Sequence, residues 1–411
     1  MPDRLPCPDL PADVRACVDA VLSAGAPLFT VGGAVRDRML GLPVDDFDFA
    51  TPLHPEVVRE VLAARGRCAG IDAVLGRVAT SAAGGEVVFT TLRRESDYGL
   101  DRRPAHVQFV TSPADDAARR DFTVNAIYQD VLTGQLVDPV GGIADLAART
   151  LRVIGDARVR LHEDPLRILR AIRFEASRGL IPSPNTFAAL AECAVGVGQL
   201  SGNRRFEELQ QILTGVGAVF AVERVLDLGI LGTLLPVLEG CEARVRRALV
   251  PFLARRAASA AGAFAVLFGE RADAALGLRA LGAPRSLRRA VLGILEARRG
   301  LLEAHGQNAA ARALASLEAQ ELQDLSTWNE IEPAGRWPID EILARGGDVP
   351  ELPTGTDVLA LGVPPGPGVG DVLRAVGQAI DEAGECDASR IRDILVREAA
   401  AWIKRSGRAG R

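Results

Sequence analysis

Residues 28–51 read LFTVGGAVRDRMLGLPVDDFDFAT, and the interpretation of the whole chain starts from this stretch. An apolar, β-branched run ends at Gly32 and Gly33, which predicts a strand followed by a tight turn. A helix-like segment comes next, and the stretch closes with a second run that combines carboxylates and aromatic residues. It therefore predicts a strand–turn–helix–strand unit with acidic side chains at its end.

The acidic residues at the end of this stretch alternate with phenylalanines. Residues i and i+2 of a strand point to the same face, so Asp46 and Asp48 should project together while Phe47 and Phe49 face the core. Two clustered carboxylates repel each other unless a cation neutralises them, and carboxylate oxygens suit Mg²⁺. Asp45 points the other way and is interpreted as a turn residue. A solvated acidic turn is the alternative that the residues alone leave open.

The glycines before this carboxylate pair favour a ligand-binding site over a solvated acidic turn. Gly32 and Gly33 allow the backbone to approach a ligand closely, and the helix that follows offers unpaired N–H groups to an anion. Arg36, one turn into that helix, could add a bidentate phosphate contact. A dinucleotide-binding fingerprint would need a third glycine and an acidic residue about 20 positions on, and both are missing. The combination predicts binding of a nucleoside triphosphate with Mg²⁺.

Composition sets wider limits. A chain of 411 residues is too long to form a single hydrophobic core, so several domains are expected. The net charge of −5 does not by itself indicate a nucleic-acid partner. Apolar runs are too short to cross a membrane, and the first residues lack the features of a signal peptide, so we expect a cytoplasmic protein. The six cysteines lack metal-ligand spacing and are interpreted as buried free thiols.

Periodicity divides the chain into an α/β part and a helical part. Strands are predicted within residues 28–33, 87–94, 105–110 and 134–140. Helices are predicted within residues 163–179, 206–213, 247–256, 286–300 and 371–382, and the basic residues 404–411 are expected to be disordered. The expected fold class is α+β.

Several motifs, in order, resemble those of the class II tRNA nucleotidyltransferase and bacterial poly(A) polymerase family, a branch of the DNA polymerase β-like superfamily. The motifs are VGGAVRDRMLGLPVDDFDFAT, TTLRRESDYGLDRRPAHVQFV, DDAARRDFTVNAIY, VDPVGGIADLAARTLRVIG, EDPLRILRAIRF and SGNRRFEELQQIL. LRALGAPRSLRRAV and ELPTGTDVLALGVPPGPGVGDVL resemble the family's later segments, so the likeness covers nearly the whole chain. It implies a catalytic nucleotidyltransferase head with a small mixed sheet (1–150), a helical neck with a nucleobase-templating helix (151–215), a helical body (216–330) and a helical, tRNA-binding tail (331–411).

The resemblance also implies roles for single residues in the head. Asp46 and Asp48 would be the catalytic metal ligands for Mg²⁺, and Gly32, Gly33 and Arg36 would hold the triphosphate. Arg120, Asp121 and Asn125 would contact the sugar and triphosphate, with Asp121 accepting from the ribose hydroxyls. Without the resemblance, Arg120 and Asp121 could equally form a structural ion pair.

Three residues of the neck are implied to select the base. Asp164 and Arg167 are three apart on a predicted helix and so share a face, and Arg170 extends the row. A carboxylate acceptor beside a guanidinium donor matches the edge of cytosine and adenine, but not that of uracil or guanine. These positions match the family's template for CTP and ATP. An ordinary surface pair on a helix is the alternative.

The sequence departs from the family pattern at two places. Val88 stands where the family has an acidic residue before the strand TTLRR, and whether Glu86, on the same strand face, replaces it stays open. The stretch IDAVLGRVATSAAGG (71–85) lacks the usual H-G-T-like turn in the loop that helps to switch specificity. The loop keeps its length, which argues against an enzyme that adds only CC.

Arginine pairs recur in the helical half and are the best candidates for contacts to RNA phosphates. They are Arg246-Arg247, Arg255-Arg256, Arg288-Arg289 and Arg298-Arg299. With aromatic residues at 4%, recognition of a folded RNA such as the tRNA acceptor arm is favoured over stacking on single strands. The sequence thus predicts CCA addition from CTP and ATP. Addition of A only or of CC only, poly(A) synthesis, and RNA binding without catalysis remain alternatives, and the oligomeric state stays open.

Overall fold

The computed structural model describes most of the chain. The described residues are 3–44, 47–67, 69–82, 85–98, 104–255, 258–269, 273–304, 307–333, 339, 342, 353–383 and 388–406. Asp45 and Asp46, one of them a predicted metal ligand, lie outside these ranges. So do Cys68, Arg256 and Cys386.

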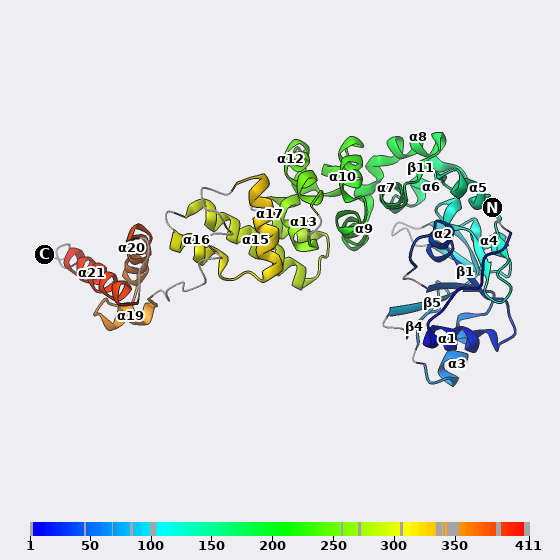
Figure 1. The fold of residues 1–411 in the computed structure, drawn as a ribbon, viewed down its shortest axis with the longest axis horizontal. Helices are drawn as coiled ribbons and strands as arrows, with labels where there is room; N and C mark the ends of the chain where they lie inside the picture. Colours follow the sequence, from blue (N-terminus) through cyan, green and yellow to red (C-terminus); the bar gives the residue numbers. More distant parts are fainter. Residues whose placement is uncertain are drawn as a thin grey trace. The chain divides into compact units, whose positions relative to one another are not determined.

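The chain forms two compact units (Figure 1). The first comprises Met1–Ile212 with Asp227–Leu234, and the second comprises Leu213–Leu226 with Leu235–Arg411. The first unit therefore holds both the predicted head and most of the predicted neck. The finer division into head, neck, body and tail stays a prediction.

A seven-stranded mixed sheet organises the first unit. Its order is β3-β4-β5-β2-β1-β8-β9. The strands are β1 (Phe29–Val31), β2 (Phe47–Thr51), β3 (Ala69–Asp72), β4 (Arg77–Ala82), β5 (Gly85–Thr91), β8 (Tyr128–Asp130) and β9 (Leu136–Val137). Only the β2–β5 pair is parallel, and the other pairs of this sheet are antiparallel. Two smaller sheets pair β6 (Arg93–Tyr98) with β7 (Pro104–Phe109) and β10 (Thr150–Leu151) with β11 (Ile181–Pro182). The α+β class is thereby confirmed.

Both faces of the main sheet are buried in part, by two different apolar clusters. One face packs Phe49 and Phe89 against helices α1 (Ala12–Leu22) and α3 (Pro55–Ala64). The other cluster contains Ala50 of β2 and Tyr128 of β8, the two strands that flank β1. Because side chains alternate along a strand, Asp48 shares its face with Ala50 and not with Phe49. The predicted inward direction of Phe49 is confirmed, and Phe47 packs against the same core in part.

Among its described residues, the first unit also contains further helices, four of them within the predicted head and the others after residue 150. They are α2 (Gly33–Met39), α4 (Pro113–Ala117), η1 (Thr123–Asn125), α5 (Gly142–Ala147), α6 (Ala157–Glu163), α7 (Leu166–Arg178), α8 (Pro184–Cys193), η2 (Ala194–Gln199), α9 (Gly202–Thr214) and α11 (Leu231–Leu234). Helix α7 buries one side and ends at Arg178, and Gly179, where the sequence predicts the helix to end, is its left-handed cap with φ 61°.

The described part of the second unit is helical. Its elements are α10 (Ala218–Asp227), η3 (Pro236–Leu238), α12 (Glu242–Leu253), α13 (Ala260–Phe268), α14 (Ala274–Ala280), α15 (Arg285–Glu303), α16 (Gln307–Leu314), α17 (Ala319–Ile331), α19 (Gly355–Ala360), α20 (Pro367–Ala383) and α21 (Ala388–Ser406). The last three helices share one apolar cluster that includes Val358, Ile380 and Ile391.

Several sequence-based predictions of elements were wrong. Residues 71–85, expected to be loop, contain strand β4 and parts of β3 and β5. Asp164 does not lie inside one helix with Arg167, because α6 ends at Glu163 and α7 begins at Leu166. Lys404, expected in a disordered tail, belongs to helix α21, which the prediction missed; its apolar face packs on α20.

Candidate nucleotide-binding site

Asp48 lies at the end of the first unit's sheet that carries the glycine turn. It is exposed, and it pairs in register with Val88 of β5. Because Thr30 pairs with Phe49 on the antiparallel neighbour, the same register continued by one residue puts Asp48 across from Val31, next to the turn. The structure thus brings the Asp48 carboxylate and the Gly32–Gly33 turn together, as the sequence predicts.

The glycine turn is shaped by its backbone conformation. Gly32 has φ 76° and ψ −129° and precedes the first residue of α2. A side chain at Gly32 would be strained at this φ, and its Cβ would lie 3.7 Å from Arg120 Nη1. The positive φ therefore explains why glycine is needed at this position. The turn lies next to the guanidinium of Arg120.

Asp121 is the centre of a buried set of polar contacts. Its Oδ1 accepts from the Phe122 N–H at 2.8 Å and from Asn125 Nδ2 at 3.0 Å, and its Oδ2 accepts from Arg170 Nε at 2.8 Å. Arg170 also pairs with Glu208 at 3.5 Å. Burial alone would raise the pKa of Asp121, but Arg170 and these hydrogen bonds hold it well below its ordinary value. Two predicted site residues, Asn125 and Arg170, are therefore assembled around the ionised carboxylate of a third, Asp121.

Arg36 is buried and paired with Asp37, whereas its predicted phosphate contact needs an accessible guanidinium. It is 3% exposed, and its Nε and Nη2 donate to the two oxygens of Asp37 at 2.8 and 2.9 Å. Its Nη1 donates to Asn125 Oδ1 at 2.5 Å, while Arg178 of α7 binds Asp37 from the other side. The phosphate contact stays a prediction, and it would require the Arg36 fork to leave Asp37.

Asp116 is a central residue that the sequence reasoning missed. It is fully buried, its Oδ1 accepts from the Arg93 N–H at 3.1 Å and from Arg119 Nε at 2.7 Å, and its Oδ2 accepts from Tyr128 Oη at 2.7 Å and from Arg120 Nε at 3.1 Å. Burial would raise its pKa, but Arg120 and Arg119 hold the pKa well below the ordinary value. Asp116 thereby fixes the guanidinium of Arg120, which faces Gly32. The only sequence signal was one more carboxylate in an already acidic stretch.

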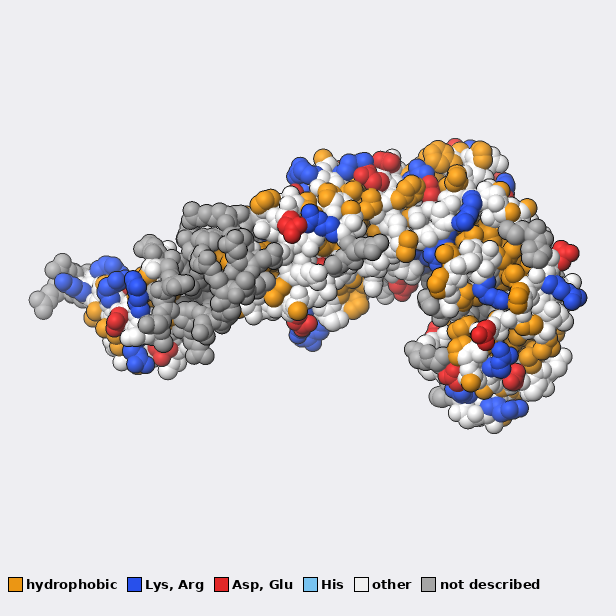
Figure 2. Space-filling model, viewed as in Figure 1, with side chains coloured by type: hydrophobic (Ala, Val, Ile, Leu, Met, Phe, Trp, Pro, Cys, Tyr) orange, Lys and Arg blue, Asp and Glu red, His pale blue; other side chains and the backbone are white. Residues whose placement is uncertain are grey.

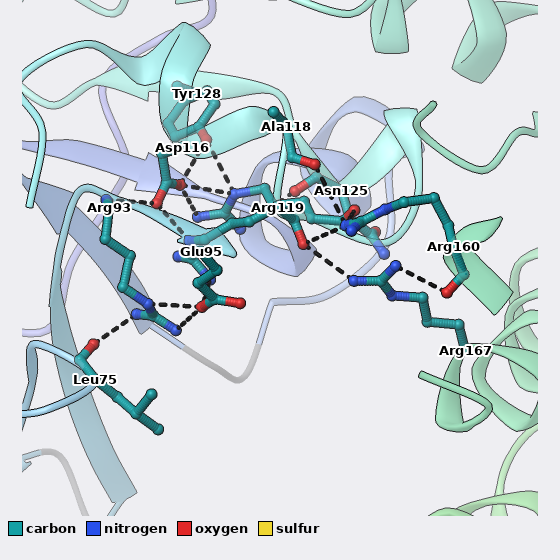
Figure 3. A network of polar contacts seen from close by, with 11 residues as sticks. Leu75, Arg93, Glu95, Asp116, Ala118, Arg119, Asn125, Tyr128, Arg160 and Arg167 are labelled. Atoms are coloured by element: carbon teal, nitrogen blue, oxygen red, sulfur yellow. Dashed lines mark hydrogen bonds and ion pairs between the residues drawn. The ribbon is translucent and has the colours of Figure 1, made fainter. Parts of the chain in front are cut away.

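The contacts of Asp116 continue to the β3–β4 turn, as Figure 3 shows. Arg93 Nε donates to Glu95 Oε1 at 2.7 Å, and its Nη1 donates to the carbonyl of Leu75 in that turn at 2.7 Å. Arg119 Nη1 reaches the same Glu95 oxygen at 3.4 Å. One connected network thus runs from the turn after β3 to the arginines beside the glycine turn.

Two of the three predicted base-selecting residues, Asp164 and Arg167, are held by neighbours. Asp164 Oδ1 accepts from the Leu166 N–H at 3.2 Å, and its Oδ2 accepts from Arg204 Nη2 at 2.9 Å. Arg167 is 5% exposed. Its Nη1 and Nη2 donate to the carbonyls of Arg160 at 3.1 Å and Arg119 at 3.2 Å. Asp164 and Arg167 therefore lie at the α6–α7 junction, and not on one helix face.

Glu86 has a partner of its own. Its Oε2 accepts from Arg77 Nη2 at 2.6 Å across the β4–β5 pair, and both side chains are exposed. Within the described ranges, no group of three His, Cys, Asp or Glu side chains could hold a metal ion. Because Asp46 is not among those residues, the predicted carboxylate pair stays a prediction.

Two further findings concern described residues outside this site. Cys7, Cys17, Cys193 and Cys241 are free thiols, but only Cys17 is buried, so the expected burial is wrong for the other three. Among the helices of the described ranges, none combines the length and the apolar character that crossing a membrane requires.

Most of the arginines predicted to contact RNA have protein partners. Arg246, Arg247, Arg255 and Arg289 pair with Glu223, Glu332, Glu330 and Glu318 respectively. On the face shown in Figure 2, basic and acidic side chains accordingly lie side by side over α10 and α12. Arg298 is 4% exposed and lies over the Trp328 ring, so the expectation that it faces RNA is wrong.

Family models match two parts of the chain. Residues 28–152 match the poly(A) polymerase head domain, and residues 179–241 match the probable RNA and SrmB-binding site of polymerase A. The first match contains the glycine turn, Asp48 and the Asp121 cluster.

Individual relatives extend this likeness. The chain is 37% identical over 235 residues to the CCA-adding enzyme of Geobacillus stearothermophilus, which is 56% of this chain and 57% of that enzyme. It is 40% identical over 196 residues to the CCA-adding enzyme of Lacticaseibacillus paracasei, 47% of this chain and 48% of that enzyme. These sequence matches span about half the length of the curated relatives.

Solved structures match over more of the chain. The crystal structure of the Bacillus stearothermophilus CCA-adding enzyme in complex with CTP superposes with a TM-score of 0.73 at 26% identity, covering 96% of this chain and 98% of that one. The Thermotoga maritima CCA-adding enzyme complexed with tRNA-CCA matches with a TM-score of 0.62 at 19% identity, which shows a shared fold.

Proposed function

Because the chain belongs to the tRNA nucleotidyltransferase and bacterial poly(A) polymerase family, we propose that it completes tRNA by adding C, C and A to the 3′ end from CTP and ATP, with release of pyrophosphate. The observation that carries this proposal is the likeness to a CTP-bound CCA-adding enzyme over 98% of that chain. The partners are then the tRNA acceptor arm, CTP and ATP, and we expect the reaction to take place in the cytoplasm.

Asp46 and Asp48 are proposed as the ligands of a divalent metal ion, Mg²⁺ by the chemistry of the donors. The suitability of this position for a metal ion is supported by the Asp48 carboxylate, which is exposed beside the Gly32–Gly33 turn. Oxygen donors that leave room for water and phosphate suit Mg²⁺. When bound, the ion would supply charge neutralisation to the triphosphate and to the attacking and leaving oxygens.

The sugar and triphosphate are assigned to the residues around Asp121. An ionised carboxylate only accepts hydrogen bonds, so Asp121 can accept from ribose hydroxyls at neutral pH. Arg120, which Asp116 holds against the glycine turn, supplies a fixed positive charge for phosphate oxygens. Gly32 and Gly33 let the backbone approach those oxygens, and Asn125 keeps Asp121 in place.

Base selection is assigned to Asp164 and Arg167, with Arg170 supporting them through Asp121. A carboxylate has room for further donors and a guanidinium has five N–H groups, so the contacts that hold these side chains do not use up their capacity. An acceptor beside a donor fits cytosine and adenine and mismatches uracil. If Arg167→Ala left the preference for CTP over UTP unchanged, the assignment would be wrong.

The decisive experiment supplies tRNA lacking one, two or three terminal nucleotides, with CTP and ATP separately and together in Mg²⁺. Synthesis of the full CCA end on the shortest tRNA supports the proposal. Extension confined to tRNA that already ends in CC would identify an A-adding enzyme. Synthesis that stops after CC has been added would identify a CC-adding enzyme. Long A-tails on any RNA would identify a poly(A) polymerase. Binding of tRNA without incorporation of either nucleotide would identify a non-catalytic RNA-binding relative.

Two carboxylate substitutions test the metal assignment. Asp48→Ala should abolish incorporation while tRNA still binds, because losing a metal ligand weakens the charge stabilisation of the triphosphate and of the transition state. Glu86→Gln is the matched comparison on the adjacent part of the sheet. Activity close to wild type would leave Glu86 as the partner of Arg77, and a loss comparable to that of Asp48→Ala would make it a third ligand.

A further inference from the structure

Arg160 makes an unusual set of contacts with the backbone of another segment. Its Nη2 lies within hydrogen-bond distance of three successive carbonyl oxygens, those of Ala118 at 3.3 Å, Arg119 at 2.9 Å and Arg120 at 3.2 Å. Its Nη1 donates to Glu163 Oε2 at 2.6 Å, and its side chain is 14% exposed. Figure 3 shows that Arg160 and Arg167 both reach the carbonyl of Arg119.

The end of helix α4 explains why a guanidinium lies there. The last carbonyls of a helix lack partners within the helix and carry partial negative charge, which favours a cation. Helix α4 ends at Ala117, and a turn continues it, because the N–H groups of Arg119 and Arg120 donate to the carbonyls of Asp116 and Ala117 at 3.3 and 3.1 Å. The carbonyls of residues 118–120 lie at the end of this turn. A planar guanidinium can serve several of these oxygens and a carboxylate at once, whereas a lysine ammonium lacks that geometry.

The carbonyl turn is not an arbitrary piece of backbone. It leads straight into Asp121, the proposed acceptor for the ribose, and it includes Arg120, the proposed phosphate contact. Arg160 itself lies four residues before Asp164, and its own carbonyl accepts from Arg167 Nη1 at 3.1 Å. The sugar-binding and base-binding residues come from separate segments, and Arg160 binds both.

We propose that Arg160 is a positioning residue for nucleotide selection, and that it fixes the spacing between the sugar site at Arg120–Asp121 and the base site at Asp164–Arg167. This inference rests on the proposed function, because it concerns the same nucleotide. Base selection by fixed side chains depends on where the sugar holds the base, and a misplacement of about 1 Å can cost about 100-fold in rate.

The test compares kcat/KM for CTP, ATP, UTP and GTP on tRNA lacking its terminal nucleotides, for wild type and for Arg160→Gln. We expect kcat/KM for CTP to fall about 100-fold and the CTP-to-UTP ratio to fall roughly tenfold, with tRNA affinity unchanged. Arg158→Gln is the control, because Arg158 lies on the same helix, is exposed and pairs with Glu192 at 2.5 Å. That variant should match wild type in both quantities.

Two further measurements keep the test decisive. Arg160→Lys, which retains the charge and puts less strain on folding, should restore rate more than it restores the CTP-to-UTP ratio. Equilibrium binding of CTP and UTP without turnover should show the same loss of preference in Arg160→Gln. An equal fall for all four nucleotides with an unchanged ratio would overturn the proposal and leave Arg160 as a structural residue. Wild-type protein that incorporates neither CTP nor ATP would instead refute the proposed function.

Discussion

The arginines of the head and those of the second unit have the same chemistry but different surroundings. In the head, Arg119 and Arg120 share the buried carboxylate of Asp116, and the buried Arg93 pairs with Glu95. In the second unit, Arg246 and Arg255 are exposed and pair with single glutamates on neighbouring helices. A charge in the interior must be paired, whereas an exposed pair gains little over water. The difference indicates that the head arginines build the site and that the others mostly balance charge.

The largest effect should follow from breaking the head network at its centre. Asp116→Ala leaves Arg119 and Arg120 without their shared carboxylate and should destabilise the first unit by about 3–5 kcal/mol. Hydrogen exchange of peptides covering 104–131 measures this loss. Tryptophan fluorescence does not, because the three tryptophans, Trp328, Trp337 and Trp402, belong to the second unit.

The neighbouring residue provides the control for that prediction. Asp115 pairs with Arg94 at 2.5 Å, but both side chains are partly exposed, at 38% and 56%. Asp115→Ala should therefore cost less than about 1 kcal/mol. Equal losses in the two variants would show that burial does not distinguish these carboxylates, and the comparison would fail.

Lowering the pH should reduce the stability of the head within a defined pH range. The pKa values of Asp116 and Asp121 lie below those of an unfolded chain, so their stabilisation is fully present above the unfolded pKa of about 4 and is lost as pH falls toward the folded values. The expected loss is of the order of 2 kcal/mol for each group. Urea unfolding followed by pulse proteolysis with pepsin at several acidic pH values measures it. Stability of the head that stays constant down to pH 3 would contradict this account.

One arginine of the second unit should behave like those of the head. Arg298 lies 4.0 Å from the Trp328 ring centroid, and its Nη2 donates to the Glu332 carbonyl at 2.7 Å. Arg298→Met should cost about 2 kcal/mol, because a desolvated cation–π contact is lost. Chemical unfolding followed by tryptophan fluorescence measures this, with Arg299→Met, which changes an exposed side chain, as the control. A negligible loss would argue against burial as the deciding factor.

The smallest effect is expected for the exposed pairs. Arg246→Gln should change stability by less than about 1 kcal/mol, because its pair with Glu223 is exposed to water. It should also leave the salt dependence of tRNA binding unchanged, since Glu223 already balances the charge. A fall of about 1 in the salt slope would show instead that Arg246 reaches a phosphate, as the sequence alone had suggested.

The sequence by itself determined the strand, the glycine turn and the acidic strand that follow one another in residues 28–51. These are local features: alternation sets which side of β2 faces the core, and a φ of 76° at Gly32 calls for glycine. The end of α7 before Gly179 was predictable for the same reason. Strand β4 was missed because its small, polar residues carry no clear alternation.

Only the tertiary structure decided which partners the charged side chains take. Asp116 lies 12 residues from Tyr128, and Arg170 lies 49 residues from Asp121, yet each pair is joined by a hydrogen bond. Arg36 and Arg298 look alike in sequence to arginines that face solvent, but packing buries both and binds them to protein atoms. Periodicity records which face of an element is apolar, whereas pairing across segments depends on how the elements pack. The sequence therefore predicts the kind of site, and the fold decides which residues support it.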